Sequence, residues 1–438
     1  MQQSNFTPDA PITGHGAATS ATKTTNRYLL PLGLIISLFF LWGMANNLND
    51  ILIKQFKKAF ELSDLQSGLV QSAFYLGYFV LAIPASMVMR RYNYKTGIII
   101  GLILYALGAF LFYPAAENSS YPFFLFALFV IASGLAFLET AANPYVSALG
   151  SAKTATFRLN MAQSFNPIGC VTGILIGQHF IFSGVEHTRE QLATMSLQAQ
   201  QDYFSAESHS VQTPYLIIGG VILLWAIIIA LTKFPEVKDE EVAHTSSTKS
   251  SLSKILGIPH FRMAVLAQFF YVGGQVCIWS FLIRYAQSSV PGTTEKMAAN
   301  YLTISLVIFT VGRFVGTALL NKIKDNNLLG IYATINILLI AIAVFFPGTV
   351  GLWALIATSF FMSIMYPTIF SLGIKNLGEH AKLASSILVM AIIGGAILTL
   401  VMGYFSDLSG IAISLLVPLA AFVFVAYFAI KGYKPQNV

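Results

Sequence analysis

The feature that most constrains this chain is a series of apolar stretches, each long enough to cross a lipid bilayer. A helix needs about 20 apolar residues to span the hydrocarbon core, and the chain contains twelve such runs. Only 10% of its 438 residues are charged, whereas a soluble protein carries about 25%. The sequence therefore predicts an all-α membrane protein with twelve transmembrane helices. The predicted spans are residues 28–50, 66–89, 96–114, 121–149, 157–182, 213–232, 263–286, 297–320, 328–347, 350–373, 383–405 and 410–430.

Two long connections, 183–212 and 233–260, interrupt this series. The second is rich in Lys, Glu, Ser and Thr and follows the sixth run, so it predicts two six-helix bundles. We expect a central cavity between these bundles. The predicted segments are a disordered cytoplasmic tail (1–26), an N-terminal six-helix bundle (27–232), a cytoplasmic linker (233–260), a C-terminal six-helix bundle (261–431) and a cytoplasmic tail (432–438).

The distribution of lysine and arginine predicts the orientation of the chain. With a cytoplasmic N-terminus, 18 of these residues fall on the inside, 5 on the outside and 2 within the spans. Cytoplasmic loops carry an excess of Lys and Arg, so we expect both termini in the cytoplasm. The net charge of +7 therefore reflects the excess of Lys and Arg in the cytoplasmic segments. It gives no reason to expect a nucleic-acid partner.

The two predicted bundles share short sequence similarities at corresponding positions. Gly77-Tyr78-Phe79-Val80 in the second run resembles Gly312-Arg313-Phe314-Val315 in the eighth, and a proline is followed by Leu-Gly at the ends of the fourth and tenth runs. Each match is short enough to arise by chance. Together they indicate a duplicated six-helix unit, as occurs in secondary transporters.

A carboxylate within the fourth run is the strongest functional signal. Glu139 follows at least ten apolar or small residues, and no basic residue lies near it in the sequence. Charged side chains are costly inside the membrane and usually serve a function there. Asn143 lies four residues further on, on the same helix face. Glu139 is predicted to bind and release a proton, and the alternative is a structural hydrogen bond to a neighbouring helix.

The first run ends in an unusually polar stretch that includes Asn46 and Asp50. These two residues are four apart and share a helix face. Asp50 is therefore a second candidate for a functional carboxylate within a span. The alternative is that the helix simply reaches water here, because Lys54, Lys57 and Lys58 follow closely.

Further polar and aromatic residues extend the candidate site into other runs. Gln163 and Asn166 lie three apart in the fifth run, while Gln275 and Trp279 belong to one stripe with Tyr271 in the seventh. Amides also form structural bonds between membrane helices, and aromatic stripes often only pack. Arg284 and Arg313 are expected to have structural or gating roles. The residues predicted to bind substrate are Asn46, Glu139, Asn143, Gln163, Asn166, Gln275, Trp279 and Tyr366.

The residue types of this candidate site indicate the class of ligand. Carboxylates and amides bind hydroxyl groups, and aromatic faces pack on the apolar side of a sugar ring. An anionic ligand would require basic residues in the cavity, and a large lipophilic ligand would require fewer amides. We therefore expect a neutral polyhydroxylated ligand, a monosaccharide.

Motifs for other classes of function are missing from the sequence. It contains no GxxxxGK[ST] phosphate loop, no HExxH and no GxSxG motif. Cys170 and Cys277 both lie inside apolar runs, so a structural disulfide is not expected. The chain is predicted to be a transporter that is not an enzyme and needs no cofactor or metal.

The polar segments also carry a family resemblance. The stretch Leu38–Asp50, the segment Leu138-Glu139-Thr140-Ala141-Ala142-Asn143-Pro144, Phe157–Gln163 and Tyr366–Gly378 resemble the major facilitator superfamily, and within it the fucose–proton symporter family. The resemblance covers nearly the whole chain and is less specific for the sugar than for the family. The usual acidic motif between the second and third helices is degenerate here, since only Arg90, Arg91 and Lys95 remain.

This resemblance implies two six-helix bundles around a central cavity. It implies that Asp50 and Glu139 couple protonation to sugar movement, with Gln163 and Asn166 in the sugar site. The expected function is import of a neutral monosaccharide by proton symport across a bacterial inner membrane, and L-fucose is the first candidate for the sugar. A monomer would suffice, because one chain holds both bundles.

Three alternatives remain open from the sequence. The first is a sodium- or proton-coupled transporter of glucose, galactose or an amino sugar within the same family. The second is a non-transporting membrane sugar sensor, with the 233–260 segment as its output element. The third is a facilitator channel, which would not need buried carboxylates.

Overall fold

The computed structural model describes residues 30–45, 48, 52, 55–56, 59–62, 64–181, 189–235 and 248–434. Every regular element in these ranges is a helix. Ten helices are long and apolar enough to cross a membrane, and Leu30–Ala45 is a shorter apolar helix. The prediction of an all-α protein that crosses the membrane many times is confirmed.

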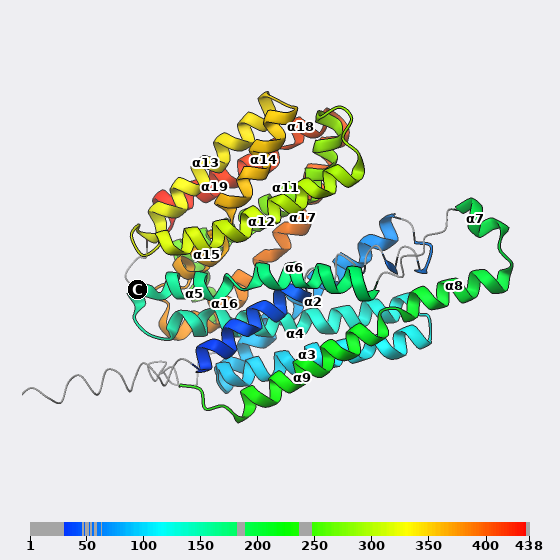
Figure 1. Ribbon diagram of the computed structural model, residues 1–438. Coiled ribbons are helices and arrows are strands. Elements are labelled where there is room, and N and C mark those ends of the chain that lie inside the picture. Colours follow the sequence, from blue (N-terminus) through cyan, green and yellow to red (C-terminus); the bar gives the residue numbers. More distant parts are fainter. Residues whose placement is uncertain are drawn as a thin grey trace, which may run out of the picture.

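The first bundle is built from the N-terminal half of the chain. Its long helices α3 and α4 pack together, α2 packs on α4, and α9 packs on α3 (Figure 1). Besides Leu30–Ala45, its elements are α2 (Asp64–Arg91), α3 (Tyr94–Glu117), α4 (Tyr121–Ala148), η1 (Ala152–Thr154), α5 (Ala155–Gln163), α6 (Asn166–Ile176), η2 (Gly177–Ile181), α7 (Arg189–Thr194), α8 (Leu197–His209) and α9 (Gln212–Leu231).

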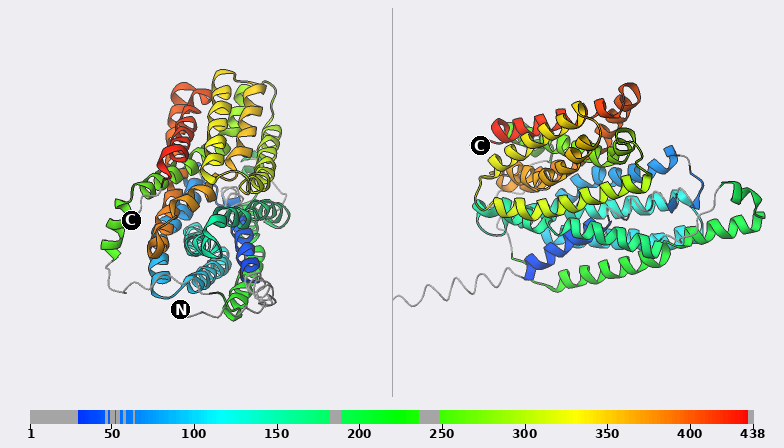
Figure 2. Two further views of the ribbon diagram at one scale, coloured as in Figure 1. Left: turned by 90° about the vertical axis from the view of Figure 1, so that its left-hand side faces the viewer. Right: turned by 45° about the horizontal axis from the view of Figure 1, so that its top comes forward.

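The second bundle is built from the C-terminal half. Its α11 packs against α17 and α19, and α13 packs against α14 and α19. Figure 2 shows most helices of the second bundle above those of the first, while α16 packs against α2 and α4. Its elements are α10 (Thr248–Gly257), α11 (Pro259–Ser289), α12 (Glu295–Leu319), α13 (Asp325–Phe345), α14 (Thr349–Met362), α15 (Met365–Gly373), η3 (Gly378–His380), α16 (Ala381–Met390), η4 (Ala391–Ile393), α17 (Gly394–Ser409), α18 (Ile411–Ser414), α19 (Leu416–Tyr427) and η5 (Phe428–Gly432).

Three of the predicted continuous spans are interrupted near a proline. The fifth run breaks at Ser164–Phe165, just before Pro167, and the tenth breaks at Ser363–Ile364, before Pro367. The twelfth breaks at Leu415, three residues before Pro418. Proline lacks the backbone N–H and clashes with the preceding turn, which weakens a helix at this point. The first two breaks place α5 and α15 as short separate helices that contact each other across the two bundles.

The sequence similarity between the two halves corresponds to one repeated contact. A Cβ atom on Gly77 of α2 would lie 2.7 Å from the Cβ of Ala132 in α4, and one on Gly312 of α12 would lie 2.5 Å from the carbonyl oxygen of Phe360 in α14. The glycines therefore allow close packing of α2 on α4 and of α12 on α14, which are the second and fourth spans of each half. The equivalence of these contacts supports the duplication inferred from the sequence.

We expect Gly169→Val to destabilise the N-terminal bundle. A Cβ at Gly169 would lie 1.9 Å from the carbonyl oxygen of Phe40, so α6 and the Leu30–Ala45 helix would have to separate. Overpacking of this kind typically costs about 1–3 kcal/mol. Thermal unfolding of the purified protein in detergent measures the effect. Gly220→Val is the matched control, because nothing lies within 4 Å of a Cβ there, and an equal loss in both variants would contradict the prediction.

Candidate functional site

Glu139 lies in the middle of α4 and is completely buried, at 0% exposure. The hydroxyl of Tyr366 donates a hydrogen bond to Oε1 of Glu139. Tyr366 belongs to α15, at the break before Pro367, so this bond joins the two bundles. The other carboxylate oxygen, Oε2, makes no hydrogen bond of normal geometry among the described residues, although the Asn143 side chain lies close to the carboxylate.

A chain of polar contacts continues from α4 across the interface. Nε2 of Gln163 donates to Oδ1 of Asn143 at 2.9 Å. Nη1 of Arg313, on α12, donates to Oε1 of Gln163 at 3.3 Å. Gln163 is the last residue of α5, so the helix break fixes its side chain between the two partners.

Arg313 is buried, with 4% of its surface exposed. Its guanidinium carbon lies 5.0 Å from the centre of the Phe309 ring, a favourable cation–π position. No ion pair between Arg313 and another described residue is found. Its positive charge is therefore held by the Gln163 amide and an aromatic face.

Several buried polar atoms near this series of polar contacts make no hydrogen bond of normal geometry with the described residues. They include Oε2 of Glu139, Nδ2 of Asn143 and Oδ1 of Asn160, and the Asn143 side chain lies beside the Glu139 carboxylate. Leaving such groups unpaired costs about 1–3 kcal/mol each, so they are suited to bind hydroxyl groups of a ligand. The set offers both acceptors and a donor, which matches the chemistry of a neutral sugar.

The aromatic candidates of the seventh run lie next to this cluster. Nε1 of Trp279 donates to Oγ of Ser359 at 3.1 Å. The Trp279 ring meets Phe309 edge-on at 5.0 Å, and Phe309 is the ring beneath Arg313. Gln275 is half-buried one turn away on α11.

Other candidates are not placed in the cluster. Nδ2 of Asn166 donates to the carbonyl oxygen of Phe39 at 3.2 Å, so it links α6 to the Leu30–Ala45 helix. The structure does not bring its amide to Glu139 or Gln163. Asn46 and Asp50 lie outside the described residues, so their roles remain predictions.

Two buried residues of the site were not singled out from the sequence. Gln268 on α11 is fully buried near the hydroxyl of Tyr366, and neither of its amide atoms has a hydrogen bond of normal geometry. Tyr78 on α2 is buried near Glu139 and Trp42. Gln268 lies three residues before Tyr271, so extending the seventh-run stripe by one turn would have found it.

The two bundles also meet at the end of the molecule that carries Lys153, Lys322, Lys324 and Lys375, which we call the lysine-rich end. Oγ1 of Thr156 in α5 donates to Oδ2 of Asp325 at 2.5 Å and lies 2.9 Å from Oγ of Ser371. One turn further along α5, Nδ2 of Asn160 donates to Oγ1 of Thr368 at 3.2 Å. These contacts join the two bundles at the lysine-rich end.

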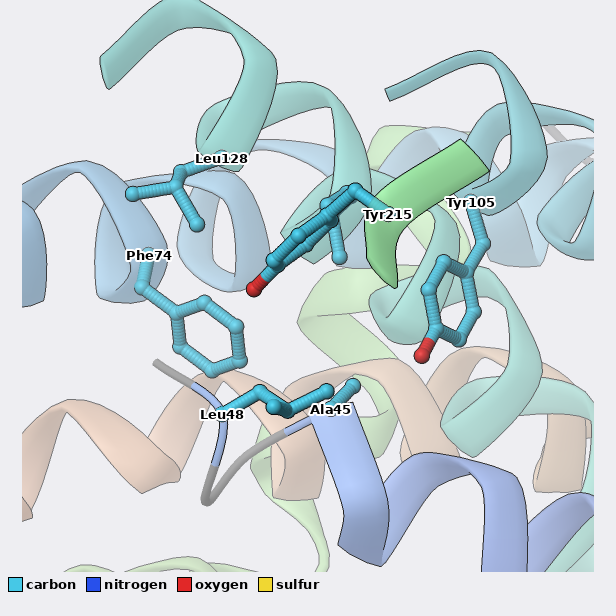
Figure 3. Close-up of a pocket in the computed structure, with 7 residues that line it drawn as sticks. Ala45, Leu48, Phe74, Tyr105, Leu128 and Tyr215 are labelled. Atoms are coloured by element: carbon cyan, nitrogen blue, oxygen red, sulfur yellow. The ribbon is translucent and has the colours of Figure 1, made fainter. Parts of the chain in front are cut away.

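A separate small cavity lies inside the N-terminal bundle. Figure 3 shows Phe74, Leu128 and Tyr215 around it, with Ala45, Leu48 and Tyr105 on its other sides. Its volume is about 10 Å³, and about 10–15 Å³ is needed for one water molecule. This gap is too small for a sugar. The gap is a space between packed side chains of the N-terminal bundle, where the buried hydroxyl of Tyr105 has no described partner.

Comparison with known proteins identifies the family. Residues 34–392 match the model of the Major Facilitator Superfamily. The L-fucose-proton symporter of Escherichia coli (strain K12) is 51% identical over 92% of this chain and 93% of its own length. A glucose/galactose transporter of Brucella abortus biovar 1 (strain 9-941) is 36% identical over 94% of this chain and 96% of its own.

A solved structure agrees with this similarity. The crystal structure of the major facilitator transporter FucP in the outward conformation superposes with a TM-score of 0.88 at 50% identity, and the match covers 94% of this chain and 100% of that one. The two-bundle arrangement predicted from the sequence is confirmed. The chain belongs to the major facilitator superfamily.

Proposed function

We propose that this protein imports a neutral monosaccharide, most specifically L-fucose, together with protons. The observation that carries the proposal is a fully buried carboxylate, Glu139, bonded to Tyr366 of the opposite bundle. A protonatable group at this position can link proton binding to the relative movement of the bundles. The sugar assignment is supported by the 51% identity to a protein named as an L-fucose-proton symporter.

The proposed mechanism is alternating access. With the bundles open to the outside, Glu139 and Asp50 take up a proton, and the sugar hydroxyls bind to the buried polar atoms beside Asn143 and Gln163. Neutralising a buried carboxylate removes the free-energy cost of keeping its charge away from water. The bundles then rock around the site, the contacts of Thr156 and Asn160 break, and sugar and proton leave on the inside.

The membrane potential and the proton gradient supply the energy. One elementary charge that moves down the potential releases about 2.3 kcal/mol per 100 mV. This corresponds to roughly a fiftyfold accumulation of a neutral sugar per 100 mV when one proton is coupled to each sugar. A facilitator channel would give no accumulation.

We also propose the orientation and setting of the chain. The Lys and Arg bias supports two cytoplasmic termini, with the 233–260 segment as a cytoplasmic linker between bundles at 27–232 and 261–431. The bacterial sources of the relatives support a location in the inner membrane. One chain holds both bundles, which supports a functional monomer.

A second candidate is a glucose or galactose transporter, because a relative at 36% identity carries that name. Both candidates are tested in weakly buffered cells that express the protein. We expect L-fucose to raise the external pH as protons enter with it, and D-glucose and D-galactose to have little effect. An unchanged pH despite sugar uptake would rule out proton symport, and a pH rise only with glucose or galactose would replace the proposed substrate.

A further inference from the structure

A cavity of about 350 Å³ opens at the lysine-rich end, away from Glu139. Four lysines line it, namely Lys153, Lys322, Lys324 and Lys375, together with Asp325 and Tyr433. Small-molecule sites usually have volumes of about 300–1,000 Å³. The cavity is therefore large enough for a small anionic group.

The charge of this cavity is strongly unbalanced. Asp325 is its one acidic lining residue, and the carboxylate already accepts a hydrogen bond from Thr156. The four lysines are exposed, and within the described part of the chain none of them forms an ion pair. The positive-inside rule explains why lysines occur on this side, but it does not require four of them to surround one cavity.

A helix terminus adds to this positive field. Helix α13 begins at Asp325, on the wall of the cavity, and continues for 21 residues. The first turn of a helix has free backbone N–H groups and a partial positive charge. Anions are favoured at this position, and the lysines next to it strengthen the effect.

The cavity is shared by the two bundles. Lys153 comes from η1, directly before α5 of the N-terminal bundle, whereas Lys322, Lys324 and Lys375 belong to the C-terminal bundle. The hydrogen bond from Thr156 to Asp325 lies at the same junction. The four lysines surround one volume because the bundles meet at this end, and they would separate when the bundles part.

We propose that this cavity binds a phosphate-bearing anion and does so only while the lysine-rich ends of the bundles are together. The phosphate belongs either to an anionic lipid headgroup or to a free phosphorylated molecule. Basic pockets between transmembrane helices on the cytoplasmic side bind lipid phosphates, and a cavity that opens to water also admits a free ion. Binding favours the state that is closed at this end, because a ligand stabilises the conformation to which it binds more tightly.

The test uses the full-length protein purified in a neutral detergent. One arm titrates inorganic phosphate by calorimetry, with sodium chloride at equal ionic strength as a control. The second arm measures retention of phosphatidylglycerol against phosphatidylcholine by native mass spectrometry. The variant K322Q/K324Q removes two cavity charges, and K233Q/K254Q removes two exposed charges from the same end outside the cavity.

We expect K322Q/K324Q to weaken binding about tenfold or more, since each basic residue near a lipid phosphate contributes about 1 kcal/mol. K233Q/K254Q should bind like the wild type. A response to phosphate identifies a free ligand, and selective retention of phosphatidylglycerol alone identifies a lipid headgroup. If neither probe binds, or if both double variants change binding equally, the proposal is wrong. Thermal unfolding of all three proteins shows whether they are equally folded.

Discussion

Replacing Glu139 by glutamine is expected to abolish proton-driven accumulation of the sugar. Glutamine has nearly the same shape and is neutral, so it resembles the protonated carboxyl group and can still interact with Tyr366. It cannot release a proton. The inside-to-outside sugar ratio should fall from roughly fiftyfold per 100 mV to about one, while exchange of labelled for unlabelled sugar should persist.

Glu117→Gln is the matched control for this prediction. Glu117 is a carboxylate of the same bundle, at the end of α3, and its half-exposed side chain lies 3.7 Å from His209. This variant should accumulate sugar like the wild type. Full accumulation by Glu139→Gln would show that Glu139 does not couple protons. Loss of both exchange and accumulation would indicate a structural role instead.

The second large effect is expected for Gln163→Ala. Gln163 donates to Asn143 and accepts from Arg313, so its removal leaves the Asn143 amide oxygen without its partner. The buried Arg313 keeps only the long 3.5 Å bond to the backbone carbonyl of residue 163. Each lost hydrogen bond of this kind costs about 1–3 kcal/mol. We expect the apparent affinity for the sugar to fall about tenfold or more, measured as the Kd in equilibrium binding to the purified protein.

Ser164→Ala tests whether this loss is specific. Ser164 is the next residue and is also buried, but its hydroxyl donates only to the carbonyl oxygen of Asn160 within the same segment. We expect sugar affinity to change less than twofold, which is below about 0.5 kcal/mol. A Gln163→Ala protein that binds the sugar normally would place Gln163 outside the sugar site.

The spans could be predicted from the sequence because lipid imposes a simple requirement of length and apolarity. The predicted 96–114 and 121–149 runs correspond to α3 and α4. The interruptions at Ser164–Phe165 and Ser363–Ile364 were not predicted, although Pro167 and Pro367 lie nearby. An apolar run remains apolar through such a break, so hydropathy alone does not detect it.

The site could be predicted only in part. Glu139 and Asn143 share a face of one helix, so their proximity could be predicted from their spacing, while their role in the site stays a prediction. The hydrogen bonds of Glu139 to Tyr366 and of Gln163 to Arg313 join residues 227 and 150 positions apart. No local pattern encodes such contacts, because they depend on how the two bundles dock.

The most direct test of the account is uptake of labelled L-fucose into membrane vesicles, with and without an imposed proton gradient. Galactose and glucose serve as control sugars. The account predicts gradient-driven accumulation of L-fucose that a protonophore abolishes. No uptake of L-fucose, together with hexose uptake stimulated by sodium, would contradict both the proposed sugar and the proposed coupling ion.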